Sequence, residues 1–211
     1  MTRILAVDTT ADHGSIALAE DANVVEEAAL ESADGFAHVL FGEMERMLAR
    51  RGLDWRSIDV FAAAAGPGAF TGVRVGLAAV KGLAEAAGRK VIAVSNLQAL
   101  AWFGTKSLRG VVIDARRGDV FGAVYDDRLQ IIGEEVVMPL DRWLAALPPG
   151  EIEFISAGVA IPVSAPVRQA PRKIAGAVAA IAALRIEAAR DPAEIDANYV
   201  RRSDAELRWQ D

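Results

Sequence analysis

The chain has 211 residues, of which 53% are hydrophobic and 25% charged, and this length suits one globular unit or two small lobes with a substantial core. The formal net charge of −6 argues against a protein that binds nucleic acid by itself, because such proteins carry a basic face. The absence of cysteine excludes disulfides, thiolate metal sites and cysteine nucleophiles.

Three short strands open the chain. The apolar runs that predict them lie at 4–7, 15–19 and 24–30. Polar turns separate these runs, which favours an antiparallel meander. The first turn begins with Asp8, Thr9 and Thr10. In such a turn the carboxylate, hydroxyls and backbone N–H groups can hold a phosphate. The alternative is an Asx turn whose threonines bond their own backbone.

A helical period follows at residues 36–50. Its apolar face is wider than one core contact requires, and it includes two methionines, which suit adaptable interfaces. We therefore expect part of this face to contact another subunit, although the alternative is that the helix only covers its own sheet. The residues assigned to the contact are Phe36, His38, Val39, Leu40, Met44 and Met47.

A glycine-rich turn then separates a predicted strand at 60–65 from a predicted helix at 72–87. The Gly-Pro-Gly run requires a turn, and we expect Thr71 to cap the helix and Gly88 to end it. A turn before a helix can hold an anion at the helix N-terminus, and the alternative is a tight turn that only leads into the helix. With the first turn, this gives the candidate phosphate-binding residues Asp8, Thr9, Thr10, Gly66, Gly68 and Thr71.

Small residues recur along the 72–87 helix at helical spacing. Glycine inside a helix costs about 1 kcal/mol relative to alanine, so its repetition indicates that something packs very close to this backbone. We expect two helices from each of two subunits to form a bundle here, and packing on the chain's own sheet is again the alternative. The residues assigned to this second contact are Gly72, Val73, Gly76, Ala79 and Val80.

The strand pattern returns in the second half of the chain. Further strands are predicted at 91–94, 110–113, 120–125, 129–137 and 151–157. The order of strands and turns aligns Asp8 with Asp114 and predicts an internal duplication, with chance similarity of two meanders as the alternative. The second turn carries Arg116 and Arg117 where a phosphate turn needs small or hydroxyl residues. We expect these arginines either to fill the cleft or to point outward into ion pairs.

A meander followed by alternating helices and strands, present twice, is the organisation of the actin/sugar kinase/Hsp70 (ASKHA) fold. The sequence therefore predicts an α/β protein with two related βββαβα lobes, at 1–100 and, in reduced form, at 101–211. A helix is predicted at 173–190. No signal peptide is visible, and the apolar run at 174–184 is too short to span a membrane, so we expect a cytoplasmic protein with no membrane partner.

Four segments of the chain resemble the bacterial TsaB (YeaZ) family, which takes part in making N6-threonylcarbamoyladenosine at position 37 of tRNA. They are ILAVDTT (4–10), GPGAFTGVRVG (66–76), VSNLQALA (94–101) leading to DARRG (114–118), and YVRRSDAE (199–206). The resemblance implies a non-catalytic scaffold subunit. Its partners would be the related catalytic subunit TsaD and the ATPase TsaE, and it would meet tRNA only through the complex.

The resemblance implies no firm cofactor, and it leaves open an adenine nucleotide at a subunit interface and a homodimer when the chain is alone. We expect no metal site, because the chain has two histidines, His13 and His38, and TsaD-like proteins use an H-x-x-x-H pair. Four positions after His38 stands Gly42. The alternative function is a stand-alone ASKHA-type nucleotide-dependent phosphotransferase or ATPase, against which the arginines of the second turn argue.

Overall fold

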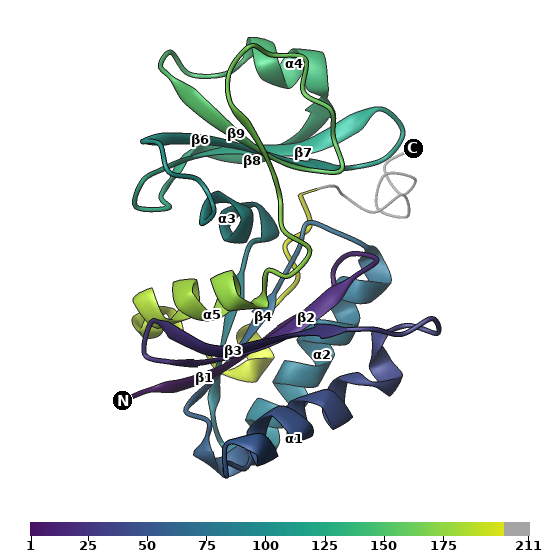
Figure 1. Ribbon diagram of the computed structural model, residues 1–211, viewed down its shortest axis with the longest axis vertical. Coiled ribbons are helices and arrows are strands. Elements are labelled where there is room, and N and C mark those ends of the chain that lie inside the picture. The colour runs from purple at the N-terminus through teal and green to yellow at the C-terminus, as the bar shows by residue number, and fades with distance from the viewer. Residues whose placement is uncertain (201–211) are drawn as a thin grey trace. The chain divides into compact units, whose positions relative to one another are not determined.

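The computed structural model describes residues 1–200 as two compact units (Figure 1). The first unit comprises Met1–Ala99 and Arg172–Ala197, and the second comprises Leu100–Pro171 and a stretch that begins at Asn198. The predicted division into 1–100 and 101–211 differs from this, because the chain returns to the first unit near its end. The returning helix is apolar on all sides, and such a helix is stable only when other elements surround it.

The first unit contains a five-stranded sheet in the order β3-β2-β1-β4-β5. Its strands are β1 (Arg3–Asp8), β2 (Gly14–Glu20), β3 (Asn23–Leu30), β4 (Val60–Ala64) and β5 (Lys90–Val94). The first three form the predicted antiparallel meander, and β4 and β5 run parallel to β1. All residues of β4 are buried, as expected for a parallel strand that helices cover on both faces.

Three helices cover this sheet. They are α1 (Leu40–Arg50) and α2 (Phe70–Ala87) on one face and α5 (Ala175–Leu184) on the other (Figure 1). The predicted helix at 36–50 is divided, because residues 36–38 form a short 3-10 turn in which the Val39 N–H donates to the Phe36 carbonyl over 3.1 Å. Tight turns of this kind are common at helix N-termini.

The returning helix α5 is shorter than the predicted 173–190, and its residues Ala175–Ala182 are all buried. The Ser15 hydroxyl oxygen accepts hydrogen bonds from the N–H groups of Ile174 and Ala175 over 3.2 and 3.0 Å. The Glu27 carboxylate accepts from the Gly176 N–H over 2.8 Å. These bonds satisfy N–H groups that a helix start leaves without partners.

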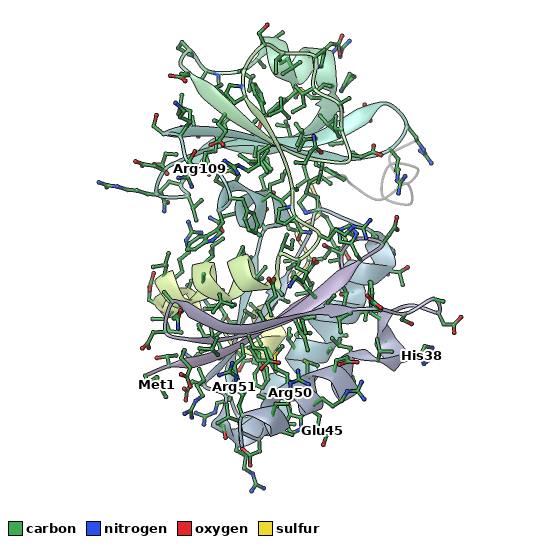
Figure 2. All side chains as sticks on the ribbon, viewed as in Figure 1. Met1, His38, Glu45, Arg50, Arg51 and Arg109 are labelled. Atoms are coloured by element: carbon green, nitrogen blue, oxygen red, sulfur yellow. The ribbon has the colours of Figure 1, made fainter. Side chains whose placement is uncertain are left out.

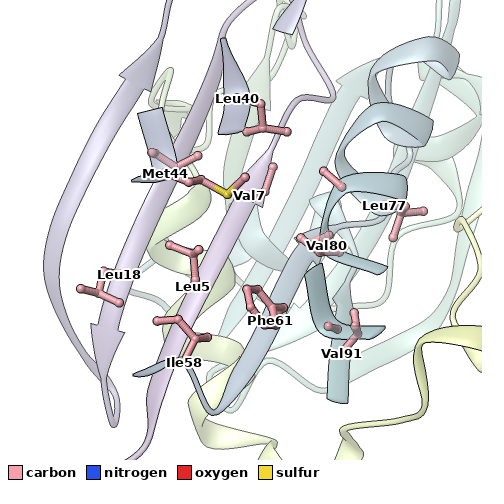
Figure 3. Close-up of a cluster of buried hydrophobic side chains, with 14 of the residues drawn as sticks. Leu5, Val7, Leu18, Leu40, Met44, Ile58, Phe61, Leu77, Val80 and Val91 are labelled. Carbon is pink, nitrogen blue, oxygen red and sulfur yellow. The ribbon is translucent and has the colours of Figure 1, made fainter. Parts of the chain in front are cut away.

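The main hydrophobic core lies between the first sheet and the pair α1 and α2 (Figure 3). Fully buried side chains of this core include Leu5, Val7, Leu18, Leu40, Met44, Ile58, Phe61 and Val80. Each such side chain contributes about 1.5–3 kcal/mol when it leaves water. The apolar face of α1 and the inner face of α2 are therefore largely buried within the first unit itself.

The second unit repeats the strand order of the first. Its sheet has the order β10-β9-β6-β7-β8. The strands are β6 (Leu108–Asp114), β7 (Asp119–Asp126), β8 (Ile131–Pro139), β9 (Ile152–Ala157) and β10 (Val167–Gln169). β6 to β8 form an antiparallel meander, and β9 and β10 run parallel to β6. The predicted internal duplication is therefore confirmed, with β6 in the position of β1.

Among residues 1–200, the helices of the second unit are fewer and shorter than those of the first. α3 (Asn96–Ala101) connects the two halves of the chain, and α4 (Leu140–Ala145), which the sequence analysis did not predict, packs on β7 and β8. Residues 158–166, which follow β9, form no helix, whereas the corresponding position after β4 holds α2. The prediction of a reduced second lobe is confirmed.

Candidate functional site

The Asp8–Thr10 turn at the end of β1 is buried, with residue exposures of 2%, 1% and 3% from Asp8 to Thr10. The Asp8 carboxylate accepts a hydrogen bond from the Thr10 N–H over 2.9 Å and another from the Thr10 hydroxyl over 2.6 Å. The first bond closes an Asx turn. Burial raises the pKa of Asp8, and the two bonds from Thr10 oppose that rise.

The helix α2 lies directly on this turn. The Thr9 hydroxyl donates to the Gly72 carbonyl over 2.7 Å, and the Ala69 N–H donates to the Thr10 carbonyl over 2.7 Å. A Cβ atom at Gly76 would stand 2.7 Å from the Thr9 hydroxyl oxygen, and one at Gly72 would overlap the Thr9 carbonyl. Gly72 and Gly76 are therefore needed for contact with the chain's own turn.

A buried asparagine, Asn96, joins the two candidate phosphate-binding turns. Its side-chain N–H donates to the Thr10 hydroxyl, and its carbonyl oxygen accepts from the Gly66 N–H over 3.0 Å. Its own backbone N–H donates to the Gly66 carbonyl over 2.8 Å. This role of Asn96 was not predicted from the sequence. The signal available was a polar residue just after a buried strand, which also fits a helix cap.

The structure thus brings together five of the six candidate phosphate-binding residues, namely Asp8, Thr9, Thr10, Gly66 and Gly68. Their groups bond one another and α2: both threonine hydroxyls and the Gly66 N–H already have partners within the first unit. Gly68 lies against the Thr10 carbonyl, 2.6 Å from where its Cβ would be. The arrangement is a tight polar joint between β1, the Gly66–Gly68 turn and α2.

The sixth candidate, Thr71, does not cap α2. The helix begins at Phe70 with Ala69 as its N-cap, and Thr71 is an exposed residue of the first turn. The reason is the bond from the Ala69 N–H to Thr10, which sets the start of the helix two residues earlier. Gly88 ends the helix in the left-handed conformation at φ 63°, as predicted.

The corresponding turn of the second unit is open. The Asp114 carboxylate accepts from the Arg116 N–H over 2.8 Å, which is the same Asx bond as in the first turn. Its side chain is 43% exposed, and the Arg116 side chain is 79% exposed, with a guanidinium nitrogen 3.9 Å from the Asp114 carboxylate. Arg116 therefore points outward, which was one of the two predicted alternatives.

Most residues assigned to a subunit contact are buried in the first unit. Leu40, Met44 and Met47 on α1 are fully buried, as is Val80 on α2, and Val73 and Ala79 are 4% and 6% exposed. Gly72 and Gly76 lie against Thr9. The six assignments to buried side chains are wrong, because the first unit's own core already covers these side chains. The assignment of Gly72 and Gly76 to a subunit contact stays a prediction. Phe36, His38 and Val39 are partly or fully exposed and remain candidates.

The opposite faces of the two helices carry the exposed apolar residues. Phe41 on α1 is 48% exposed and Phe70 on α2 is 51% exposed. Behind Phe70 runs a stripe at four-residue spacing whose members are Arg74, Ala78, Gly82 and Ala86, all exposed. The Arg74 guanidinium lies over the Phe70 ring, 3.7 Å from its centroid. We call Phe41, Phe70 and this stripe the outer face. Figure 2 shows His38 and Glu45 at the surface of the same region.

Within residues 1–200, no group of three or more His, Asp or Glu side chains is arranged to hold a metal ion. No helix in this described part of the chain is long and apolar enough to cross a membrane.

Comparison with known proteins finds relatives that take part in tRNA modification. A family model described as TsaD, tRNA N6-adenosine threonylcarbamoyltransferase, matches residues 30–198. The tRNA threonylcarbamoyladenosine biosynthesis protein TsaB of Escherichia coli (strain K12) is 35% identical over 127 residues, which cover 58% of this chain and 54% of that protein. The match thus spans about half the length of that relative. An uncharacterized protein of Mycobacterium tuberculosis is 32% identical over 211 residues, covering 97% of this chain and 94% of that protein.

Solved structures agree with these relatives. YeaZ from Pseudomonas aeruginosa superposes with a TM-score of 0.80 at 25% identity, covering 94% of this chain and all of that chain. Component A of (R)-2-hydroxyglutaryl-CoA dehydratase from Acidaminococcus fermentans has a TM-score of 0.54 at 8% identity over 89% of this chain, a likeness of fold alone. The predicted ASKHA-type α/β fold is confirmed. The chain belongs to the TsaB (YeaZ) family of tRNA threonylcarbamoyladenosine biosynthesis proteins.

Proposed function

We propose that the chain is a non-catalytic subunit of the complex that installs N6-threonylcarbamoyladenosine at position 37 of tRNA. In this role it binds a TsaD-like catalytic subunit through the outer face of α1 and α2, and a TsaE-like ATPase joins the pair. The observation that carries the proposal is the closed Asp8–Thr10 turn. Its hydroxyls bond Asp8 and α2, so they are not positioned for a substrate phosphate as they would be in a phosphotransferase.

The outer face supports the docking part of the proposal. Phe41 and Phe70 are exposed, Phe70 continues the stripe of α2 at four-residue spacing, and a Cβ at Gly82 would meet no atom within 4 Å. Small residues on a helix allow another helix to approach closely, and the flanking aromatic rings supply the buried area that anchors an interface. The occupant we propose is the TsaD-like subunit, because this chain is related to that subunit in sequence over residues 30–198.

A matched pair of substitutions tests the docking face. Ala78→Glu places a carboxylate in the middle of the outer face, whereas Ala145→Glu makes the same change at an exposed position of α4 in the second unit. We expect Ala78→Glu to weaken binding to the TsaD-like subunit by more than about tenfold, since an unpaired charge is costly at the centre of an interface. Isothermal titration of the two purified subunits measures this directly. Equal affinities for both variants and the wild type would contradict the proposal.

Reconstitution of the modification reaction tests the role itself. Threonylcarbamoyl transfer to tRNA by the TsaD-like and TsaE-like subunits should require this chain, and Ala78→Glu should lower the rate while Ala145→Glu should not. The isolated chain with ATP and Mg²⁺ should show no turnover above background. Steady turnover there would favour the stand-alone phosphotransferase instead. The same titrations with and without ATP test whether an adenine nucleotide joins at the subunit interface, which remains a prediction, as does a homodimer of the isolated chain.

A further inference from the structure

We infer that the Asp8–Thr10 turn is a positioning element for partner docking, because it fixes the first half of α2 and with it the outer face. The inference rests on the proposed function, since it concerns the same docking face. It assigns to a turn of the phosphate-binding type a use other than phosphate binding. The residues that carry it are Thr9, Thr10 and Asn96, with Asp8 as the acceptor that holds Thr10.

Thr9 makes the direct contact with the helix. Its hydroxyl donates to the Gly72 carbonyl over 2.7 Å in the first turn of α2, and the same oxygen stands 2.7 Å from the Cβ position of Gly76, one turn later. Both glycines bring the helix backbone onto the turn without an intervening side chain. The helix therefore cannot move toward β1, and movement away from β1 would break the hydrogen bond.

A second connection reaches the residues just before α2. The Thr10 carbonyl accepts from the Ala69 N–H, the N-cap of the helix, over 2.7 Å. The Thr10 hydroxyl donates to Asp8 and accepts from Asn96, which in turn holds both the N–H and the carbonyl of Gly66. The turn that leads into α2 is thus held at both ends. Buried polar networks of this kind rigidify the elements they join when every member is satisfied.

The same stretch of α2 carries the docking residues on its other side. Gly72 and Gly76 face the turn, while Phe70 and Arg74 are exposed and stacked on each other. Because a helix moves as a rigid body over two turns, a shift at the Thr9 contact displaces the outer face by a similar amount. Preorganised interfaces bind more tightly than mobile ones, since less order is lost on binding. The turn therefore contributes to affinity without touching the partner.

Two conservative pairs test the inference in the full-length chain. Thr10→Val removes the hydroxyl at nearly constant volume, and Thr10→Ser retains it. Asp8→Ala removes the acceptor, and Asp8→Asn retains a carbonyl oxygen that can accept both bonds from Thr10. We expect Thr10→Val and Asp8→Ala to bind the TsaD-like subunit roughly two- to thirtyfold more weakly than the wild type. Thr10→Ser and Asp8→Asn should bind as the wild type does.

Amide hydrogen exchange on the isolated chain supplies a readout that does not depend on the partner. Exchange should accelerate at residues 70–76 in Thr10→Val and Asp8→Ala, and should stay unchanged at residues 83–87 of the same helix. A merely global loss of stability would accelerate both ends alike. Asn96→Ala offers an independent variant if either of the others fails to fold, because it removes the bonds to Thr10 and Gly66 from the far side.

The outcomes separate this inference from the proposed function. If Ala78→Glu abolishes binding but Thr10→Val changes neither binding nor exchange at 70–76, the docking face stands and the positioning role is wrong. If Thr10→Val accelerates exchange at 70–76 but leaves affinity unchanged, the turn holds the helix without contributing to docking, and the inference fails. Weaker binding together with faster exchange at residues 70–76, both restored to wild-type values in Thr10→Ser, is the result that supports it.

Discussion

The two turns that the duplication places in equivalent positions have the same backbone bond and different surroundings. In each, an aspartate at the end of the first strand of its sheet accepts from the N–H two residues later, over 2.9 Å at Asp8 and 2.8 Å at Asp114. The Asp8 residue is 2% exposed, whereas the Asp114 side chain is 43% exposed. The difference follows from α2, which covers the first turn and has no counterpart after β9. Strand order was retained in both units, and helix cover decides what each turn can do.

The largest effect on stability is expected at Trp143, which fills the core of the second unit, where long helices are absent among the described residues. Trp143 on α4 is 4% exposed and packs edge-on against Phe154 with ring centroids 6.1 Å apart. Its indole also lies on Gly122 of β7, where a Cβ atom would stand 2.5 Å from the indole nitrogen. The small core of this unit thus depends on one large side chain, with Val112, Val120, Val124, Ile152 and Phe154 around it.

We expect Trp143→Ala to lower the free energy of unfolding of the second unit by about 3–5 kcal/mol. Urea titration followed by far-UV circular dichroism measures the loss, and a separate transition at low urea would show that the second unit unfolds first. Trp102→Ala is the control within the same unit, since Trp102 is 37% exposed and its removal leaves a smaller cavity. Equal losses in the two variants would mean that α4 does not hold the second core.

The strands were the most predictable part of this chain, and the helices that cover them the least. Alternating apolar runs and polar turns located both meanders and the duplication, because strand pairing follows a local pattern. What the sequence did not reveal was which residues, distant along the chain, each helix packs against. The glycines of α2 indicated a close contact correctly, but the contact that the structure shows is with Thr9 of the same chain, 63 residues away for the Gly72 bond.

Because packing partners are distant in sequence, the buried and exposed sides of α1 and α2 could not be told apart either. Met44 and Met47 suggested an adaptable interface, yet both are fully buried in the first core. A single sequence gives the width of an apolar face, but the side that meets the sheet depends on tertiary packing. Phe41 and Phe70 were visible as aromatic residues and were not assigned, because nothing local marks them as exposed. The return of α5 to the first unit was likewise hidden, since an all-apolar helix can pack on either sheet.

A smaller effect is expected from the buried carboxyl group of Asp8, which distinguishes the first turn. Burial raises the pKa of Asp8 above its ordinary value of 3.8, so the folded protein binds a proton more tightly at this group than the unfolded chain does. Stability therefore falls as the pH rises from the unfolded-state pKa through the folded-state pKa, and stays reduced above it. Asp8→Asn removes the titrating group and keeps the acceptor for Thr10.

Asp8→Asn should stabilise the protein at pH 7 by on the order of 1 kcal/mol, and the gain should vanish below about pH 3.8, where the wild-type carboxyl is neutral in both states. Urea midpoints measured across this pH range give the comparison. Asp114→Asn is the matched control in the open turn, where the carboxylate contacts solvent and no buried charge is removed. A pH-independent gain for Asp8→Asn, or an equal gain for Asp114→Asn, would contradict the interpretation.

The smallest effect concerns the backbone of the open turn. Arg116 and Arg117 adopt left-handed conformations at φ 65° and 56°, and no residue of the Asp8–Thr10 turn does so. This region costs a non-glycine residue about 1 kcal/mol or more, while glycine loses more backbone entropy on folding by about 0.5–1 kcal/mol. Arg116→Gly should therefore leave stability unchanged or raise it by about 0.5 kcal/mol.

The sign of that change distinguishes strain from simple loss of a side chain. Arg128, in the other hairpin of the same unit, is equally a surface arginine but has no left-handed backbone, so Arg128→Gly adds the entropy cost with no strain to relieve. It should lower stability by about 0.5–1 kcal/mol. Opposite or clearly unequal shifts in thermal midpoint would show that the backbone at Arg116 is strained in the open turn. Equal losses in both variants would place no strain at Arg116, and the open turn would then be as relaxed as the closed one.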